Sequence, residues 1–168
     1  MQALEESTER LAIRALNRDI DKTWVDWAVN MLMSGYDTEH LRILAGETEP
    51  FNQFQMIELI DKVFAELGLP YSDEQQTLRN YACWLVERSL SGQLDNFKVL
   101  EILKDICIDL DLDDNYFDFY LLYFAKDDLS YSTEQWHWDG ATRDNIETII
   151  TDYFKSWRSN CATSAQIN

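Results

Sequence analysis

Apolar residues recur along most of this chain at the spacing of one helix face. Between residues 20 and 32 they fall at positions i, i+4, i+7, i+8, i+11 and i+12, which predicts an amphipathic helix that Gly35 is placed to stop. The same spacing predicts five further helices and a less regular one at the N-terminus. Their approximate ranges are 4–16, 38–46, 54–67, 72–91, 99–110 and 146–157.

Capping and turn residues mark several of these helix ends. Asp37 or Thr38 can cap the short helix that Gly46 ends. A glycine and a proline follow the next helix in the sequence Gly68-Leu69-Pro70. A capping box, Ser72-Asp-Glu-Gln75, opens the helix after that. Local signals and apolar spacing therefore agree on where these helices begin and end.

Three stretches depart from the regular pattern. Residues 116–124 are aromatic and apolar on all sides, which suits a buried strand or a buried helix. We favour a helix, because no other stretch alternates and a lone strand would have no sheet to join. Residues 129–141 predict the longest loop, and residues 159–168 predict a flexible C-terminal tail. The fold is therefore expected to be all-α: a single compact domain over residues 1–158, with about seven or eight helices in a bundle-like or orthogonal arrangement.

The net charge of the chain limits the classes of molecule that the protein is expected to bind. The chain has 14 basic and 31 acidic residues, a net charge of −17. Residues 1–90 carry 8 basic and 16 acidic groups, and residues 91–168 carry 6 and 15, so neither half offers a basic lobe that could grip phosphates. We expect no binding to nucleic acid or to an anionic membrane, whereas a basic protein would be attracted.

The termini and the cysteines bear on location. The N-terminus lacks the basic and apolar regions of a secretion signal, and no stretch approaches the roughly 20 apolar residues of a membrane span. The three cysteines are Cys83, Cys107 and Cys161; the first two lie in apolar runs and are interpreted as buried thiols. This combination predicts a protein of the reducing cytoplasm.

One segment concentrates the acids: six aspartates lie between Asp105 and Asp118 with no basic residue among them. The spacing Asp109-x-Asp111-x-Asp113 matches the opening of an EF-hand, but Asp114 replaces the turn glycine and Tyr120 the final glutamate. The acids from 111 to 114 precede a predicted helix, where a cap and acidic residues are stabilising. The stripe Glu101, Asp105 and Asp109 has no such explanation, because like charges at i, i+4 destabilise a helix.

Signals for catalysis are weak. The two histidines, His40 and His137, lie far apart, and no zinc-binding, nucleophile-elbow, P-loop or dinucleotide-binding motif is present. Five glycines leave little material for a phosphate cradle. His40 is expected to face solvent, and His137 to be a packed loop residue. We therefore expect no enzyme activity, no metal site and no cofactor.

The predicted loop carries two tryptophans, Trp136 and Trp138. We expect both to pack back onto the core and staple the loop. If they are exposed instead, they would serve as aromatic anchors at an interface beside the acids.

The N-terminal part of the chain carries a resemblance. The residues are Trp24-x-x-Trp27-Ala28, the segment Gly35–Gly46 and Pro50-Phe-Asn-Gln-Phe54. Together they resemble a segment of small helical bacterial proteins, some of which look like immunity proteins of toxin–immunity systems, including polymorphic-toxin and contact-dependent-inhibition systems. The likeness covers roughly the first 70 residues and transfers no catalytic residue. It implies a helical protein that binds and neutralises a toxin, which agrees with the independent charge argument.

The leading hypothesis is a non-enzymatic acidic protein of bacterial origin that neutralises a basic toxin. The alternative is a regulatory or scaffold module whose acids only confer solubility, and a third hypothesis is an enzyme with an irregular carboxylate site. The residues expected to bind the partner are Glu101, Asp105, Asp109, Asp111, Asp113, Asp114, Asp118, Asp127, Asp128, Trp136 and Trp138.

Overall fold

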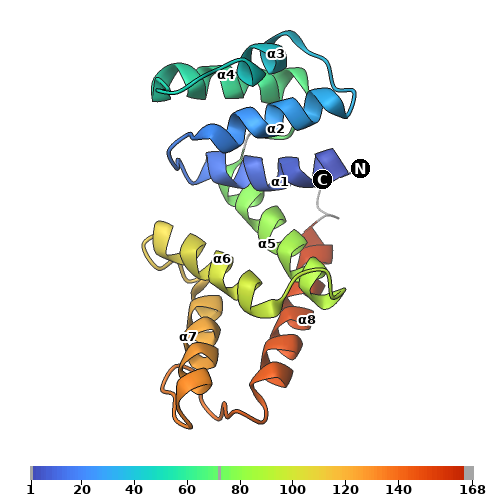
Figure 1. The fold of residues 1–168 in the computed structure, drawn as a ribbon. Helices are drawn as coiled ribbons and strands as arrows, with labels where there is room; N and C mark the ends of the chain where they lie inside the picture. Colours follow the sequence, from blue (N-terminus) through green and yellow to red (C-terminus); the bar gives the residue numbers. More distant parts are fainter. Residues whose placement is uncertain (1, 72, 165–168) are drawn as a thin grey trace. The chain divides into compact units, whose positions relative to one another are not determined.

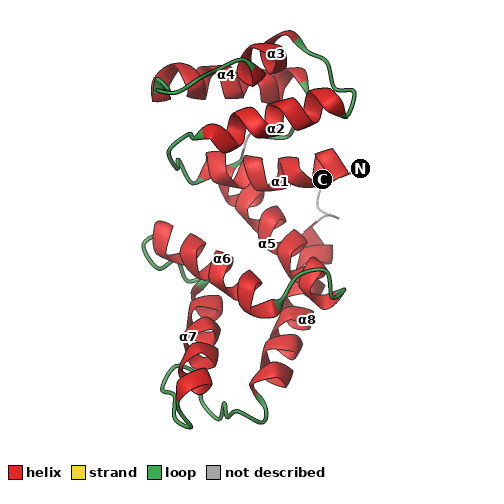
Figure 2. Cartoon of the chain, in the orientation of Figure 1, coloured by secondary structure: helices red, strands yellow, loops and turns green. Residues whose placement is uncertain are grey.

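A computed structural model describes residues 2–71 and 73–164, and these residues form eight α-helices with no strand (Figure 1, Figure 2). The all-α prediction is confirmed, and residues 116–124 belong almost entirely to a helix. Within the described residues no helix is long and apolar enough to cross a membrane. The helices are α1 (Gln2–Ala15), α2 (Lys22–Met33), α3 (Glu39–Ala45), α4 (Gln53–Glu66), α5 (Glu74–Leu90), α6 (Asn96–Asp109), α7 (Phe117–Tyr131) and α8 (Ile146–Ser164).

The chain divides into two compact units, residues 1–78 and residues 79–168, which we describe separately. The first unit holds α1 to α4 and the start of α5, and the second holds the rest of α5 with α6 to α8. The behaviour of residues 1–158 as a single domain stays a prediction.

Aromatic rings form the centre of the first unit. Figure 1 shows α1 and α2 side by side and α3 beside α4, and α3 also packs on α2. Trp24, Trp27 and Phe64 are at most 3% exposed, and their ring centroids lie 6.1–6.2 Å apart. The helical spacing that brought both tryptophans onto one face of α2 therefore places them in the core. At its edge, Arg14 pairs with both carboxylate oxygens of Asp61 at 3.0 and 3.1 Å.

Several helix ends in this unit follow the local signals. The Asp21 carboxylate caps α2 by accepting from the Thr23 N–H at 2.9 Å, and Gly35 follows that helix at a φ of +94°. Thr38 occupies the cap position of α3, but its side chain makes no cap hydrogen bond. The predicted capping box lies partly outside the described residues, since Ser72 is not among them; next to it, the Asp73 carboxylate accepts from the Gln76 N–H at 3.0 Å.

The core of the second unit lies between α6, α7 and α8. Leu103, Phe119 and Ile150, one from each helix, have no exposed surface, and Phe154 of α8 is 1% exposed. Phe119 meets the edges of Phe154 and Trp157 at 6.1 and 4.8 Å. Burial of these large side chains stabilises the unit, at roughly 1.5–3 kcal/mol for each fully buried aliphatic or phenylalanine side chain.

The C-terminal end corrects two expectations. Helix α8 continues to Ser164, so residues 159–164 are helical rather than a flexible tail, and residues 165–168 lie outside the described part. Cys83 is not a free thiol, because it forms a disulfide with Cys161, and the two Cα atoms lie 6.1 Å apart. Cys107 is a buried free thiol, as expected. A disulfide of this kind is uncommon in a reducing cytoplasm.

Candidate functional site

The acidic stripe on α6 is compensated by lysines on the same helix. Lys98 Nζ lies 2.6 Å from Glu101, and Lys104 Nζ lies 2.8 Å from Asp105. The hydrogen bond to Asp105 raises the pKa of Lys104 although burial opposes it. Asp109 also has an interaction partner. The like-charge repulsion expected along this stripe is therefore offset locally, and the stripe needs no external partner to explain it.

The segment after α6 is a turn with unusual backbone conformation. The N–H of Asp111 donates to Ile108 O, and the N–H of Leu112 donates to Cys107 O at 2.8 Å, as in a Schellman motif. Asp111 occupies the position that glycine prefers, with a φ of +54°, and Leu112 has a φ of +63°. The Asp113 carboxylate then accepts from the N–H of Asn115 at 2.8 Å.

The expected role of these aspartates at a helix start needs correction. Helix α7 begins only at Phe117, and Tyr116 in its cap position makes no side-chain cap bond. Asp113 and Asp114 therefore lie outside the helix, and Asp118 is the acid in its first turn. Burial raises the pKa of Tyr153, and a hydrogen bond to Asp118 raises it further. Asp118 is therefore within hydrogen-bond reach of the Tyr153 hydroxyl group.

The predicted partner-binding residues fall into two groups on the second unit. The acids from Glu101 to Asp118 lie along α6 and around the start of α7, whereas Asp127 and Asp128 lie near its other end. Eleven residues of helix separate Phe117 from Asp128, about 16 Å at the rise of an α-helix. Asp128 lies close to the loop that carries Trp136, because one of its carboxylate oxygens is 3.3 Å from His137 Nε2.

One glutamine side chain organises that loop. Gln135 Oε1 accepts from the N–H groups of His137 and Trp138, both at 2.8 Å. Its Nε2 donates to the carbonyl oxygens of Trp138 and Ala141 at 2.6 and 3.2 Å. One side chain therefore satisfies four backbone groups, and this fixes the backbone of residues 137–141.

Histidine 137 ties the loop back to α7. Its Nε2 lies 3.3 Å from a carboxylate oxygen of Asp128, and its ring packs against Phe124 with the centroids 5.5 Å apart. His137 is therefore a packed loop residue, in line with the sequence interpretation. His40, in contrast, does not simply face solvent, because its Nδ1 lies 2.6 Å from Glu66 Oε1.

The two loop tryptophans behave differently. Trp138 is half-buried and meets Tyr153 edge-on at 5.8 Å, so it staples the loop as expected. Trp136 is 88% exposed, which contradicts the expectation that it packs onto the core. Tyr131, in the last turn of α7, is 84% exposed. We use the name Trp136 surface for Trp136 together with exposed or half-exposed residues that precede it in the sequence, Asp127, Asp128, Tyr131 and Glu134.

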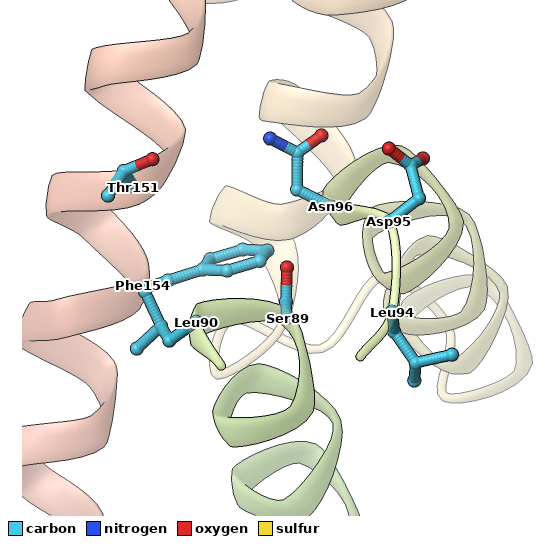
Figure 3. Close-up of a pocket in the computed structure, with 7 residues that line it drawn as sticks. All are labelled: Ser89, Leu90, Leu94, Asp95, Asn96, Thr151 and Phe154. Atoms are coloured by element: carbon cyan, nitrogen blue, oxygen red, sulfur yellow. The ribbon is translucent and has the colours of Figure 1, made fainter. Parts of the chain in front are cut away.

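A separate pocket of about 250 Å³ lies where the end of α5, the start of α6 and α8 meet (Figure 3). The hydroxyl groups of Ser89 and Thr151 can hydrogen-bond a small molecule there. The other two polar side chains already serve the fold. Asp95 caps α6 through the Lys98 N–H at 3.1 Å, and Asn96 binds Lys126 and Glu147 at 2.7 Å each. The lining residues are Ser89, Leu90, Leu94, Asp95, Asn96, Thr151 and Phe154.

The described residues include no group of three or more histidine, cysteine or carboxylate side chains arranged to hold a metal ion. No family model matches the chain, and no curated protein or solved structure shows significant similarity to it. The site therefore has to be interpreted from its own geometry, in which the Trp136 surface combines exposed aromatic rings with carboxylates.

Sequence reasoning missed two members of this arrangement. Tyr131 was counted within the predicted loop, although it ends α7 and is exposed. Gln135 carried no motif, because its role depends on backbone groups that meet it only in the folded loop. The ion pair between Lys98 and Glu101 on α6 could be predicted from the sequence, since Lys98 precedes Glu101 by three residues.

Proposed function

We propose that this protein is a non-enzymatic binding protein for a basic protein partner, and that the partner is a bacterial toxin domain which it neutralises as an immunity protein. The single observation that carries the proposal is Trp136, which is 88% exposed on a loop fixed by its own hydrogen bonds. A rigid, exposed tryptophan is the kind of side chain that supplies binding energy at interface centres.

Charge supports a basic partner. The net charge of −17 favours encounter with a positively charged protein and speeds its association. Lysines on α6 already compensate Glu101 and Asp105, so the Trp136 surface is the stronger candidate for direct contact. The acids on α6 would then contribute mainly to long-range attraction.

The sequence predicts a cytoplasmic location, whereas the Cys83–Cys161 disulfide favours an oxidising compartment. An immunity protein that meets its toxin outside the reducing cytoplasm would satisfy both the binding role and the disulfide.

The test measures association with the protein encoded by the neighbouring gene, in stopped-flow experiments at low and high salt. We expect the on-rate to fall at least about tenfold at high salt, and Asp127→Asn with Asp128→Asn to lower it at low salt. Asp105→Asn with Asp109→Asn should have a smaller effect, and Trp136→Ala should mainly raise the off-rate.

An on-rate indifferent to salt and to all of these substitutions would contradict the proposal. It would favour the alternative, a regulatory or scaffold module whose acids only confer solubility. The lysine pairing along α6 is the observation that favours this alternative.

A further inference from the structure

Two of the largest exposed rings of this protein stand close together in sequence on the Trp136 surface. Tyr131 and Trp136 are 84% and 88% exposed, and among the residues that the structure describes the other large apolar side chains with comparable exposure, Met33 and Phe54, belong to the first unit. Single exposed apolar residues are common on protein surfaces. Two highly exposed rings within six residues of sequence, with Asp127, Asp128 and Glu134 close to them along the chain, make this segment a candidate for contact with a partner.

The backbone of Trp136 is held on both sides while its ring is free. Gln135 before it bonds four backbone groups of the loop, and His137 after it packs on Phe124 and contacts Asp128. Because His137 contacts Asp128, the backbone next to Trp136 passes close to the last turns of α7. A partner would therefore lose little entropy in ordering this loop.

The lysine and the arginine that flank this surface in the sequence are engaged elsewhere. No lysine or arginine occurs between Lys126 and Arg143 in the sequence. Lys126 Nζ lies 2.6 Å from Glu147, and Arg143 Nε donates to the carbonyl oxygen of Leu129 at 2.8 Å, so both flanking cations are engaged.

We propose that the Trp136 surface binds an arginine side chain of a basic segment in the partner. A guanidinium group is planar, so it stacks on the indole face and still directs N–H donors at a carboxylate in the plane of the group. A lysine ammonium is more strongly hydrated and offers no flat face to the ring. This inference rests on the proposed function and names the chemistry of its contact.

The test titrates the full chain with three capped hexapeptides, of arginine, of lysine and of glutamine, and follows the tryptophan indole N–H signals by NMR at low salt. We expect hexa-arginine to shift the Trp136 signal and to bind several-fold more tightly than hexa-lysine, with no binding of hexa-glutamine. Trp136→Ala should weaken hexa-arginine binding about tenfold. Phe54→Ala, which removes a ring that is 74% exposed on the first unit, is the matched control and should change nothing.

The outcomes separate this inference from the proposed function. If hexa-arginine binds with strong salt dependence but equally well to wild type and Trp136→Ala, the arginine site is wrong. The proposal that this acidic protein binds a basic partner then still stands. Equal affinity for hexa-arginine and hexa-lysine also overturns the arginine site. If no basic peptide binds at low salt while both variants keep their circular dichroism spectra, the arginine site fails, and the proposed function then depends on the stopped-flow experiment alone.

Discussion

The disulfide between Cys83 and Cys161 joins α5 to the last turns of α8, across 78 positions of sequence. Weaker contacts lie around it: Arg79 donates to the carbonyl oxygen of Asn160 at 3.2 Å, and Arg158 pairs with Glu87 at 3.6 Å. The exposed residues 158–160 bury little surface. The covalent bond therefore holds the exposed last turns of α8 to α5 more firmly than these two contacts do.

Reduction of this bond is predicted to destabilise the protein. In the chain-entropy model, a closed loop of this length contributes about 4.5 kcal/mol by restricting the unfolded chain. Urea unfolding with and without a dithiol reductant measures the effect, and Cys161→Ser should behave like the reduced protein. Cys107→Ala is the control, since this variant keeps the disulfide and its stability should still fall when the reductant is added.

Thiol counting supplies an independent check. Alkylation of the unfolded, unreduced protein should modify one cysteine, Cys107, and prior reduction should expose all three. Three reactive thiols in protein purified without reductant would show that the disulfide does not form. The argument for an oxidising compartment would fall with it.

Removal of the Gln135 side chain is predicted to loosen the loop that carries Trp136 while leaving Trp136 itself unchanged. Gln135→Ala leaves four backbone groups to find water, which should cost about 2 kcal/mol. Hydrogen exchange of the His137 and Trp138 amides should become much faster. The exposed Gln93 provides the matched control, and Gln93→Ala should leave both amides protected. Unchanged exchange in Gln135→Ala would remove the case for a preorganised Trp136.

The helices could be predicted because each one buries an apolar face. The spacing of Trp24, Trp27 and Met31 fixes which side of α2 meets the core, and the structure buries all three. Even residues 116–124, whose composition allowed a strand, could be assigned by the lack of any other strand to pair with. The helical spacing of apolar residues was therefore enough to predict the all-α fold class.

Side chains in the loop and the cysteine pairing could not be predicted in this way. Trp136 and Trp138 are two residues apart in the same predicted loop, but Trp136 is 88% exposed and Trp138 is half-buried against Tyr153. Cys83 and Cys161 lie 78 positions apart, and no spacing rule relates them. Both features depend on how distant segments meet.

In the turn after α6, a glycine is predicted to give a more stable protein than an alanine, which is the reverse of their order inside a helix. Leu112 has a φ of +63°, where a Cβ atom is unfavourable by roughly 1–2 kcal/mol. Leu112→Gly should therefore be more stable than Leu112→Ala by about 1 kcal/mol in urea unfolding, since both lose the same half-exposed side chain. At Ile108, inside α6 and equally exposed, Ala should instead be more stable than Gly by about 1 kcal/mol. The same order at both sites would contradict the left-handed turn.

The contact between Glu147 and Lys126 predicts a pH dependence. Burial alone would raise the pKa of Glu147, but hydrogen bonds from Lys126 at 2.6 Å and Asn96 at 2.7 Å outweigh it and lower the pKa below its ordinary value of 4.5. A carboxyl group whose pKa is lower in the folded than in the unfolded state stabilises the fold at pH values above its unfolded pKa. That contribution is lost as the pH falls through the folded pKa.

A carbon NMR titration of the Glu147 carboxyl group should therefore have its midpoint below 4.5, and Lys126→Met should move it upward. Glu147→Gln should cost at most about 1 kcal/mol at pH 7, because this side chain is 60% exposed and solvent screens the pair. The difference between wild type and Glu147→Gln should shrink toward zero below the folded pKa, where wild-type Glu147 is also neutral. Glu87→Gln, which breaks a more exposed and longer ion pair with Arg158, should have little effect at either pH. A Glu147 midpoint at or above 4.5 would show that burial, and not the hydrogen bonds from Lys126 and Asn96, sets the charge of this group.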